Sequence, residues 1–437
     1  MYSCKKVLFL IVGKGNPKEI GYPESYYRLL RKAIDFSNAE NIILFPSGSS
    51  KENAEAIKLE YETSHNVYIE DLPEKSMEFD ADKCFEFFEG KFQTLFKNGF
   101  SAEDFIIDFT HGTKAMSAAL YAIGMRYRVS DFHYIQRNND KNGNLIEGET
   151  VKNFDASYAR GLSVLDQCRI LFKTWQFPAA KSLLLTEKPT EKLKTTVNNV
   201  KMLADFYAAW DRLDYKTAAD ICPVFEMPSF GFATTPTVQN WISGLSKFVI
   251  EPDEKNHEVL SHDQLEENAS IVLNMMFDLY ANGLRRLDSG QYEDAAIRAY
   301  RIAEMLGQFY LFKEGYISNH MSSSDPKVRD FAENNRIRKK DNTDIYPPFG
   351  RKQVIDFLDY LKHPKTAYLQ NTDAIIADIR NNSILIHGYS SRVKNAQELK
   401  TIFTSLIEQL RLIVGEEESQ SKLNAALFMN TFKDNNR

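Results

Sequence analysis

The N-terminal part of the chain alternates short apolar runs with longer segments whose apolar residues recur at helical spacing. Runs that are apolar throughout are typical of strands buried on both faces, and the longer segments have the period of amphipathic helices. Strands separated by helices form a parallel sheet with helices on both faces, so the pattern predicts a Rossmann-like, doubly wound α/β domain. The expected strands are Val7–Val12, Ile42–Phe45, Val67–Ile69, Phe105–Phe109 and Phe132–Ile135, and the expected helices are Tyr22–Phe36, Lys51–Tyr61, Met77–Phe96 and Thr113–Tyr127.

The strand pattern fades after about Asp155, and most of the remaining chain has the apolar periodicity of helices. A charged stretch at Glu251–His262, which contains Pro252, is typical of a domain boundary. The sequence therefore predicts an α/β domain over residues 1–155, a helical linker domain over 156–262 and an all-α domain over 263–437.

An aromatic residue followed three positions later by alanine recurs in the helical part. Small residues let two helices approach closely, so the recurrence fits either an array of helical-hairpin repeats or ordinary helix-turn-helix packing. The three pairs are Phe177/Ala180, Tyr215/Ala218 and Tyr292/Ala295.

The net charge of −6 argues against a surface coated in positive charge for duplex binding. A local basic groove for single-stranded RNA remains compatible with this charge. The run Arg336–Lys340 is one candidate for such a groove, and a solvated loop is the alternative.

The sequence contains neither a disulfide framework nor a zinc-ligand spacing. Without a CxxC pair, the four cysteines are expected to be reduced thiols. No stretch reaches about 18 apolar residues, and no cleavage site follows the first apolar run, so we expect a cytoplasmic protein without a membrane span. The cysteines are Cys4, Cys84, Cys168 and Cys222.

Three predicted strands are followed by loops rich in glycine, hydroxyl and lysine side chains. Ligands of doubly wound sheets bind beyond the carboxyl ends of the strands, where glycine lets the backbone approach and helix N-termini bind phosphate. Neither GxxxxGK[ST] nor GxGxxG occurs, which argues against an ordinary ATPase or dehydrogenase, and plain strand-to-helix turns are the alternative. The candidate ligand-binding residues are Gly13, Lys14, Ser47, Ser49, Thr110, His111, Gly112, Thr113 and Lys114.

The C-terminal domain contains an arginine and a histidine seven residues apart, with Asn381 and Ser383 between them. On a helix, Arg380 and His387 would share one face, about 10 Å apart along the axis. Metal-free RNA cleavage by the ribose 2′-OH needs proton transfer, which histidine provides, and phosphoryl charge stabilisation, which arginine provides. The candidate catalytic residues are therefore Arg380, Asn381, Ser383 and His387; a salt-bridged arginine with an ordinary surface imidazole is the alternative.

Other catalytic patterns are missing from the sequence. The eight histidines do not form HExxH spacing, and no GxSxG elbow occurs, so we expect no metal site and no serine hydrolase. The three tryptophans, Trp175, Trp210 and Trp241, are expected in the helical core rather than as base-stacking platforms.

Asp108–Met116 resembles the strand, Thr/Gly turn and Gly-Thr-Lys of the CRISPR-associated Rossmann fold (CARF), with His111 where many members have glycine. Arg380 to His387 resembles the R-x(4–6)-H signature of HEPN ribonucleases, and Tyr292–Glu304 resembles a HEPN helix. The order of the two is that of accessory ribonucleases in type III CRISPR antiviral defence.

This resemblance implies a homodimer that is allosterically activated by a cyclic oligoadenylate of four or six adenylates. Thr113 and Lys114 match the CARF motif directly. Arg380 and His387 of both protomers would cleave single-stranded RNA without a metal cofactor. Apart from the resemblance, we expect Arg301 and Glu304 to form a structural pair that positions the catalytic helix.

The resemblance leaves several questions open. Base preference and the identity of the general base are not fixed, nor is degradation of the activator by Lys114 with Ser47 or Thr110. Two alternative functions remain: a nucleotide-sensing regulator with an inactive HEPN-like dimerisation domain, and a toxin-type HEPN ribonuclease controlled by a partner protein.

Overall fold

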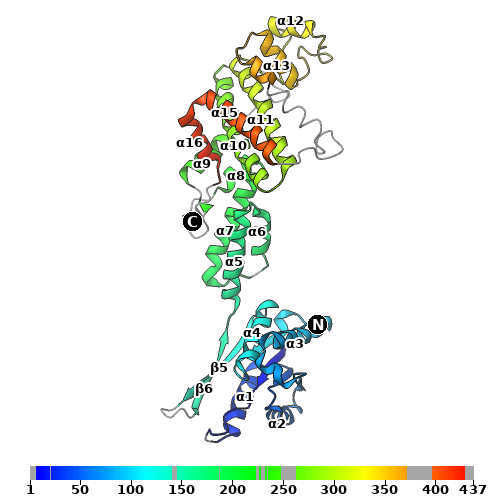
Figure 1. Cartoon of the computed structure of the whole chain (residues 1–437), viewed down its shortest axis with the longest axis vertical. Helices are drawn as coiled ribbons and strands as arrows, with labels where there is room; N and C mark the ends of the chain where they lie inside the picture. Colours follow the sequence, from blue (N-terminus) through cyan, green and yellow to red (C-terminus); the bar gives the residue numbers. More distant parts are fainter. Residues whose placement is uncertain are drawn as a thin grey trace. The chain divides into compact units, whose positions relative to one another are not determined.

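The computed structural model describes residues 6–19, 21–139, 145–186, 188–222, 226–227, 232–233, 235–247, 262–371 and 396–428 (Figure 1). They form two compact units, one made of Met1–Asp166 and Leu185–Val197, the other of Gln167–Leu184 and Asn198–Arg437. The predicted domain boundaries at residues 155 and 262 stay predictions.

The N-terminal unit contains a six-stranded sheet of order β3-β2-β1-β4-β5-β6. Strands β1 to β5 run parallel, and β6 pairs antiparallel with β5. The five predicted strands are confirmed, whereas β6 was not predicted because its polar residues interrupt any apolar run. The strands are β1 (Val7–Val12), β2 (Asn41–Pro46), β3 (Asn66–Ile69), β4 (Phe105–Asp108), β5 (Asp131–Asn139) and β6 (Leu145–Phe154).

Helices cover both faces of this sheet, as a doubly wound fold requires. Phe9 and Ile11 of β1 belong to the core formed with α3 and α4, while Leu8 and Leu10 belong to the core formed with α1 and α2. The sheet side chains alternate between these two faces because successive strand residues point to opposite sides. The helices are α1 (Glu24–Ser37), α2 (Lys51–Tyr61), α3 (Ala81–Lys97) and α4 (Lys114–Arg126), with 3₁₀ turns η1 (Lys75–Phe79) and η2 (Ala102–Asp104).

The prediction of one helix over Met77–Phe96 is wrong at its start. Asp80 has an extended backbone, and its carboxylate accepts hydrogen bonds from the N–H groups of Asp82 and Lys83 at 3.1 Å each. These bonds satisfy the first donors of α3, so the helix begins after Asp80 and η1 precedes it.

The described residues of the second unit are helical apart from a two-stranded sheet, and α10 and α11 lie side by side in it (Figure 1). Two helices, α5 (Ser157–Lys173) and α7 (Glu191–Asp211), begin in the first unit and end in the second. The other elements of the second unit are α6 (Phe177–Leu184), α8 (Tyr215–Ile221), β7 (Glu226–Met227), β8 (Phe232–Ala233), α9 (Pro236–Ser246), α10 (His262–Asp288), α11 (Tyr292–Lys313), α12 (Pro326–Asn334), α13 (Arg351–Tyr360), α15 (Ala396–Val414) and α16 (Glu416–Ala426).

The aromatic/alanine recurrence marks the same corner three times. Its aromatic residues are the first residues of α6, α8 and α11, and all three alanines are buried. Two residues before each aromatic, the backbone is left-handed, with φ of 61° at Trp175, 65° at Leu213 and 72° at Gly290. A left-handed residue ends the preceding helix, and the alanine gives the next helix room to pack.

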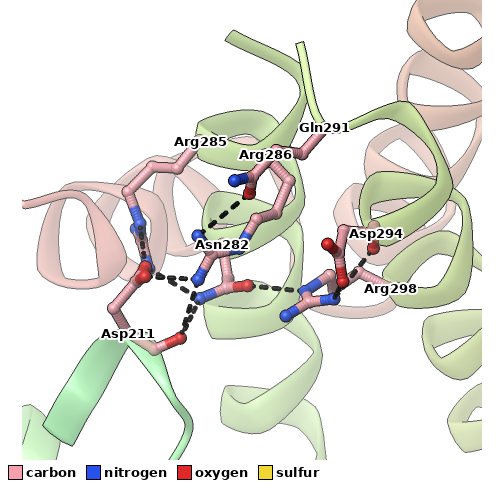
Figure 2. Close-up of polar contacts among 7 residues, drawn as sticks. All are labelled: Asp211, Asn282, Arg285, Arg286, Gln291, Asp294 and Arg298. Carbon is pink, nitrogen blue, oxygen red and sulfur yellow. Dashed lines mark hydrogen bonds and ion pairs between the residues drawn. The ribbon is translucent and has the colours of Figure 1, made fainter. Parts of the chain in front are cut away.

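A polar network joins the end of α7 to α10 and α11 (Figure 2). The Asp211 carboxylate accepts hydrogen bonds from the guanidinium groups of Arg285, at 3.1 Å, and Arg286. Asn282 donates to the Asp211 carbonyl at 2.9 Å and accepts from Arg298 at 2.8 Å. Arg285 is only 4% exposed, so Asp211 compensates a charge that water cannot reach.

A second buried carboxylate, Asp278 of α10, collects three donors. The indole N–H of Trp210 donates to it at 2.8 Å, the Tyr215 hydroxyl at 2.9 Å and the Trp241 indole N–H at 3.3 Å. Burial raises the pKa of Asp278. Trp210 is fully buried and Trp241 packs partly buried against the core, so neither ring serves as an open stacking platform.

Candidate functional site

A cavity of about 460 Å³ lies at the carboxyl ends of β1, β2 and β4. The strand order reverses between β1 and β4, which is where ligands of doubly wound sheets bind. Eight of the nine predicted ligand residues line it; the exception is Lys114, the first residue of α4. The lining residues are Gly13, Lys14, Gly15, Asn16, Tyr26, Ser47, Ser49, Glu78, Phe79, Thr110, His111, Gly112, Thr113 and Arg137.

The loops after β1 and β4 touch through two glycines. A Cβ added to Gly13 would lie 2.9 Å from the backbone nitrogen of Gly112. Gly112 itself has φ of +86°, and a Cβ there would lie 2.3 Å from a methyl group of Ile11. The floor of the cavity is therefore open backbone, because any larger residue would force the two loops apart.

The loop after β1 is fixed by side chains from α1, α2 and the loop before α1. The Asn53 amide donates to the carbonyls of Gly13 and Lys14 at 3.0 and 3.2 Å, and the Tyr22 hydroxyl donates to the Lys14 carbonyl at 2.9 Å. The Tyr26 hydroxyl accepts from the Gly13 N–H at 2.7 Å. With its backbone held this way, the loop presents the Lys14 ammonium to solvent at the cavity.

The loop after β2 is held by hydroxyl groups and one carboxylate. The Ser50 hydroxyl donates to the Val12 carbonyl at 2.6 Å and lies 2.9 Å from the Ser47 hydroxyl. The Gly48 N–H donates to a carboxylate oxygen of Glu78 at 2.7 Å. Ser47 is thus buried and engaged within the protein.

The loop after β4 is hydrogen-bonded to the sheet and, through the Thr113 hydroxyl and the Glu78 carbonyl, to η1. The Thr110 N–H donates to Asp108 at 2.9 Å, and the Thr110 hydroxyl accepts from the Ile135 N–H at 2.8 Å. Thr113 caps α4 by accepting from the Met116 N–H at 3.2 Å. The predicted ligand residues Thr110 and Thr113 therefore shape the loop as well as line the cavity.

Two buried titratable groups lie at this end of the sheet: Asp108, the last residue of β4, and His111 in the loop that follows. Burial, reinforced by the positive charge of Arg137, lowers the pKa of His111 to about 3, and its Nε2 atom has no hydrogen-bond partner among the described residues. Burial raises the pKa of Asp108 to about 6, and hydrogen bonds from Thr110 oppose this rise. His111 is therefore a neutral imidazole at physiological pH, able to donate or accept but not to carry charge.

The predicted catalytic residues Arg380, Asn381, Ser383 and His387 lie outside the described residues. The proposed structural pair upstream is present, since the Arg301 guanidinium contacts the Glu304 carboxylate on α11.

The run Arg336–Lys340 lies in a loop with mostly exposed side chains. Lys339 in this run pairs with Asp344 at 3.5 Å.

Two comparisons with known proteins gave matches, one to the C-terminal part of the chain and one to nearly its whole length. Residues 265–412 match the family model of the Csm6 HEPN domain, a span that includes Arg380 and His387. The structure of Enterococcus italicus Csm6 bound to cyclic hexa-2′-fluoro-hexa-dAMP superposes with a TM-score of 0.57 and 15% sequence identity, covering 96% of this chain and 99% of that chain. The chain has the CARF–HEPN fold of Csm6. No curated protein sequence matches it.

This CARF–HEPN fold confirms the predicted fold class and the predicted resemblance. Six residues that line the cavity were not among the predicted ligand residues: Gly15, Asn16, Tyr26, Glu78, Phe79 and Arg137. Arg137 lies on β5 two residues beyond the predicted strand end, and Glu78 and Phe79 lie on η1, where a regular helix was predicted. The polar end of β5 was the one available sign of Arg137.

Neither a metal-ligand cluster nor a membrane-spanning helix occurs in the described part of the chain. The described cysteines, Cys84, Cys168 and Cys222, are free thiols. Burial raises the pKa of Cys84 and of Cys168 to about 11, so neither is a reactive thiolate at neutral pH.

Proposed function

We propose that the protein is a ribonuclease whose HEPN domain is activated when a cyclic oligoadenylate binds the CARF cavity. The observation that carries the proposal is the match to the Csm6 HEPN domain over residues 265–412, which span the Arg380 and His387 motif. The antiviral role in type III CRISPR defence and a cytoplasmic location follow from the same proposal.

The cavity offers groups that can bind the phosphates of a cyclic oligoadenylate. The exposed side chains of Lys14 and Arg137 provide positive charge, and Ser49 provides an exposed hydroxyl. The N-termini of α2 and α4 follow two of its loops, and helix N-termini attract phosphate. The ring-bound Csm6 that this fold resembles makes cyclic hexaadenylate the first activator to test, ahead of cyclic tetraadenylate.

The size of the cavity favours a homodimer. A volume of about 460 Å³ is within the range of pockets that hold one drug-sized ligand. A ring of four or six nucleotides is larger than such a ligand, so two cavities from two protomers would share it. The proposed HEPN mechanism also requires a homodimer, since the composite site contains Arg380 and His387 from each of two protomers.

The proposed reaction needs no metal ion. The ribose 2′-OH attacks the adjacent phosphorus, the 5′-oxygen leaves, and a 2′,3′-cyclic phosphate remains on the upstream fragment. His387 would transfer protons, Arg380 would stabilise the extra negative charge, and Asn381 and Ser383 would orient the phosphate. The ligand activates only if it binds the active dimer arrangement more tightly than the resting one, with the helical linker carrying the change.

One titration tests this proposal: cleavage of a fluorescent single-stranded RNA against a panel of cyclic oligoadenylates, in EDTA. We expect cleavage that depends on one ring size, and complete loss of cleavage but unchanged ring binding in His387→Ala. Binding without cleavage in the wild type would favour the inactive regulator, and cleavage indifferent to every ring would favour the partner-controlled toxin. Cleavage by purified His387→Ala at the wild-type rate would remove His387 from the mechanism.

A further inference from the structure

The 3₁₀ turn η1 is fixed firmly against the cavity. The Glu78 carboxylate accepts from the Gly48 N–H at 2.7 Å, and the Glu78 carbonyl accepts from the Thr113 hydroxyl. The Cys84 thiol donates to the Met77 carbonyl at 3.0 Å. Glu78 is only 5% exposed, so this short turn is anchored to the loop after β2, to the cap of α4 and to α3.

Phe79 ends this anchored turn with its ring in solvent. It is 75% exposed, although it follows the buried Glu78 directly, and it lines the cavity. A single exposed apolar residue is common on protein surfaces and has no meaning alone. Phe79 differs from such a residue because the contacts of Glu78 fix its backbone at the edge of a polar cavity.

The remaining described lining residues suit phosphate and ribose but offer no open aromatic face. The other aromatic lining residue, Tyr26, is 2% exposed, and its hydroxyl is bonded to the Gly13 N–H. The side chains of Lys14, Arg137 and Ser49 can donate hydrogen bonds to phosphate or ribose oxygen atoms. The phosphates of a nucleotide in this cavity would therefore contact the cationic and hydroxyl side chains, and its base could contact the exposed ring of Phe79 at the edge.

We infer that Phe79 is a stacking platform for an adenine base of the bound ring, held in place by η1. This inference rests on the proposed cyclic oligoadenylate ligand and adds a base-recognising residue to it. Base–aromatic stacking contributes about 1–3 kcal/mol per base, which corresponds to roughly 5- to 150-fold in affinity. Because stacking uses the π face, an aliphatic side chain of similar size cannot replace it.

The test measures binding of cyclic hexaadenylate and cyclic tetraadenylate to the full-length protein by calorimetry. We expect Phe79→Ala and Phe79→Leu to weaken binding of the activating ring roughly 5- to 150-fold, and Phe79→Tyr to stay within about threefold of wild type. Leu59→Ala is the matched control, because Leu59 on α2 is also an exposed apolar residue, at 73%, but is not one of the lining residues.

A spectroscopic readout separates stacking from a general loss of fit. A ring that carries 2-aminopurine in place of one adenine should lose fluorescence on binding wild type and Phe79→Tyr, and keep it on binding Phe79→Leu at saturation. Equal affinity and equal quenching in wild type and Phe79→Leu would overturn the inference while the proposed function stands. A wild-type protein that binds neither ring would overturn both.

Discussion

The Glu78 carboxylate accepts a hydrogen bond from the backbone N–H of Gly48 at 2.7 Å, within a cavity that we propose binds phosphates. The hydrogen bond fixes η1, but the negative charge of the Glu78 carboxylate opposes the binding of an anionic ligand. The carboxylate thus has two separable effects, one on the shape of the cavity and one on its charge.

Glu78→Gln should tighten binding of the activating ring. The amide oxygen can still accept from Gly48, while the loss of one negative charge removes a repulsion of about 1 kcal/mol, or roughly fivefold in affinity. Glu78→Ala should weaken binding, because the anchor of η1 is lost as well. Calorimetric titration of both variants checks this, and equal affinities in the two would contradict it.

Asp108→Asn should change how the stability of the N-terminal unit depends on pH. The folded-state pKa of Asp108, about 6, lies above its ordinary value of 3.8, so the folded protein binds the proton more tightly. The resulting stabilisation is complete below pH 3.8 and lost as pH rises through 6, a change of at most about 3 kcal/mol.

The asparagine variant cannot lose this contribution, so its stability relative to wild type should rise between pH 4 and pH 7. His111 has the opposite dependence, but it is present in both proteins and cancels in the difference. Scanning calorimetry across this pH range measures the effect, with Asp82→Asn as an exposed control that should show a flat difference.

Asp278→Ala should destabilise the helical unit by about 3 kcal/mol or more, because the substitution leaves the donors of Trp210, Tyr215 and Trp241 without their carboxylate. All three tryptophans of the chain lie in this unit, so urea unfolding followed by tryptophan fluorescence reports on it. Asp288→Ala, an exposed position on the same helix, should change the free energy of unfolding by less than about 0.5 kcal/mol.

Asp211→Ala should cost about 3–5 kcal/mol of stability, because it leaves the buried Arg285 guanidinium without its partner (Figure 2). Asp294→Ala removes a carboxylate that is 45% exposed from a pair with Arg298 in the same network, and should cost less than about 1 kcal/mol. The same urea experiment compares the two, and similar losses would show that burial does not govern this network.

The sequence predicted the sheet well where burial is complete. Every residue of β1 is buried, so its apolar run ends where the strand ends. The strand β6 was not predicted because it lies at the edge of the sheet, paired with β5, and charged residues interrupt its apolar ones. A strand with one solvated side leaves no continuous apolar run to detect.

The candidate cavity was predicted from the loops that follow β1, β2 and β4, because parallel strands bring their carboxyl ends together. Arg137 was missed because β5 continues past Ile135 through polar residues that leave the core. Phe79 was missed because an apolar residue in a short turn has the same local sequence pattern as one in a buried helix. The cap at Asp80 separates η1 from α3, a break that the apolar pattern does not show.

Because burial lowers the pKa of His111 to about 3, its imidazole carries no positive charge at physiological pH before a ligand binds. Electrostatic attraction at the cavity then comes from Lys14 in the loop after β1 and from Arg137 of β5. Occupancy of the cavity by an anionic ligand should accordingly fall strongly as ionic strength rises.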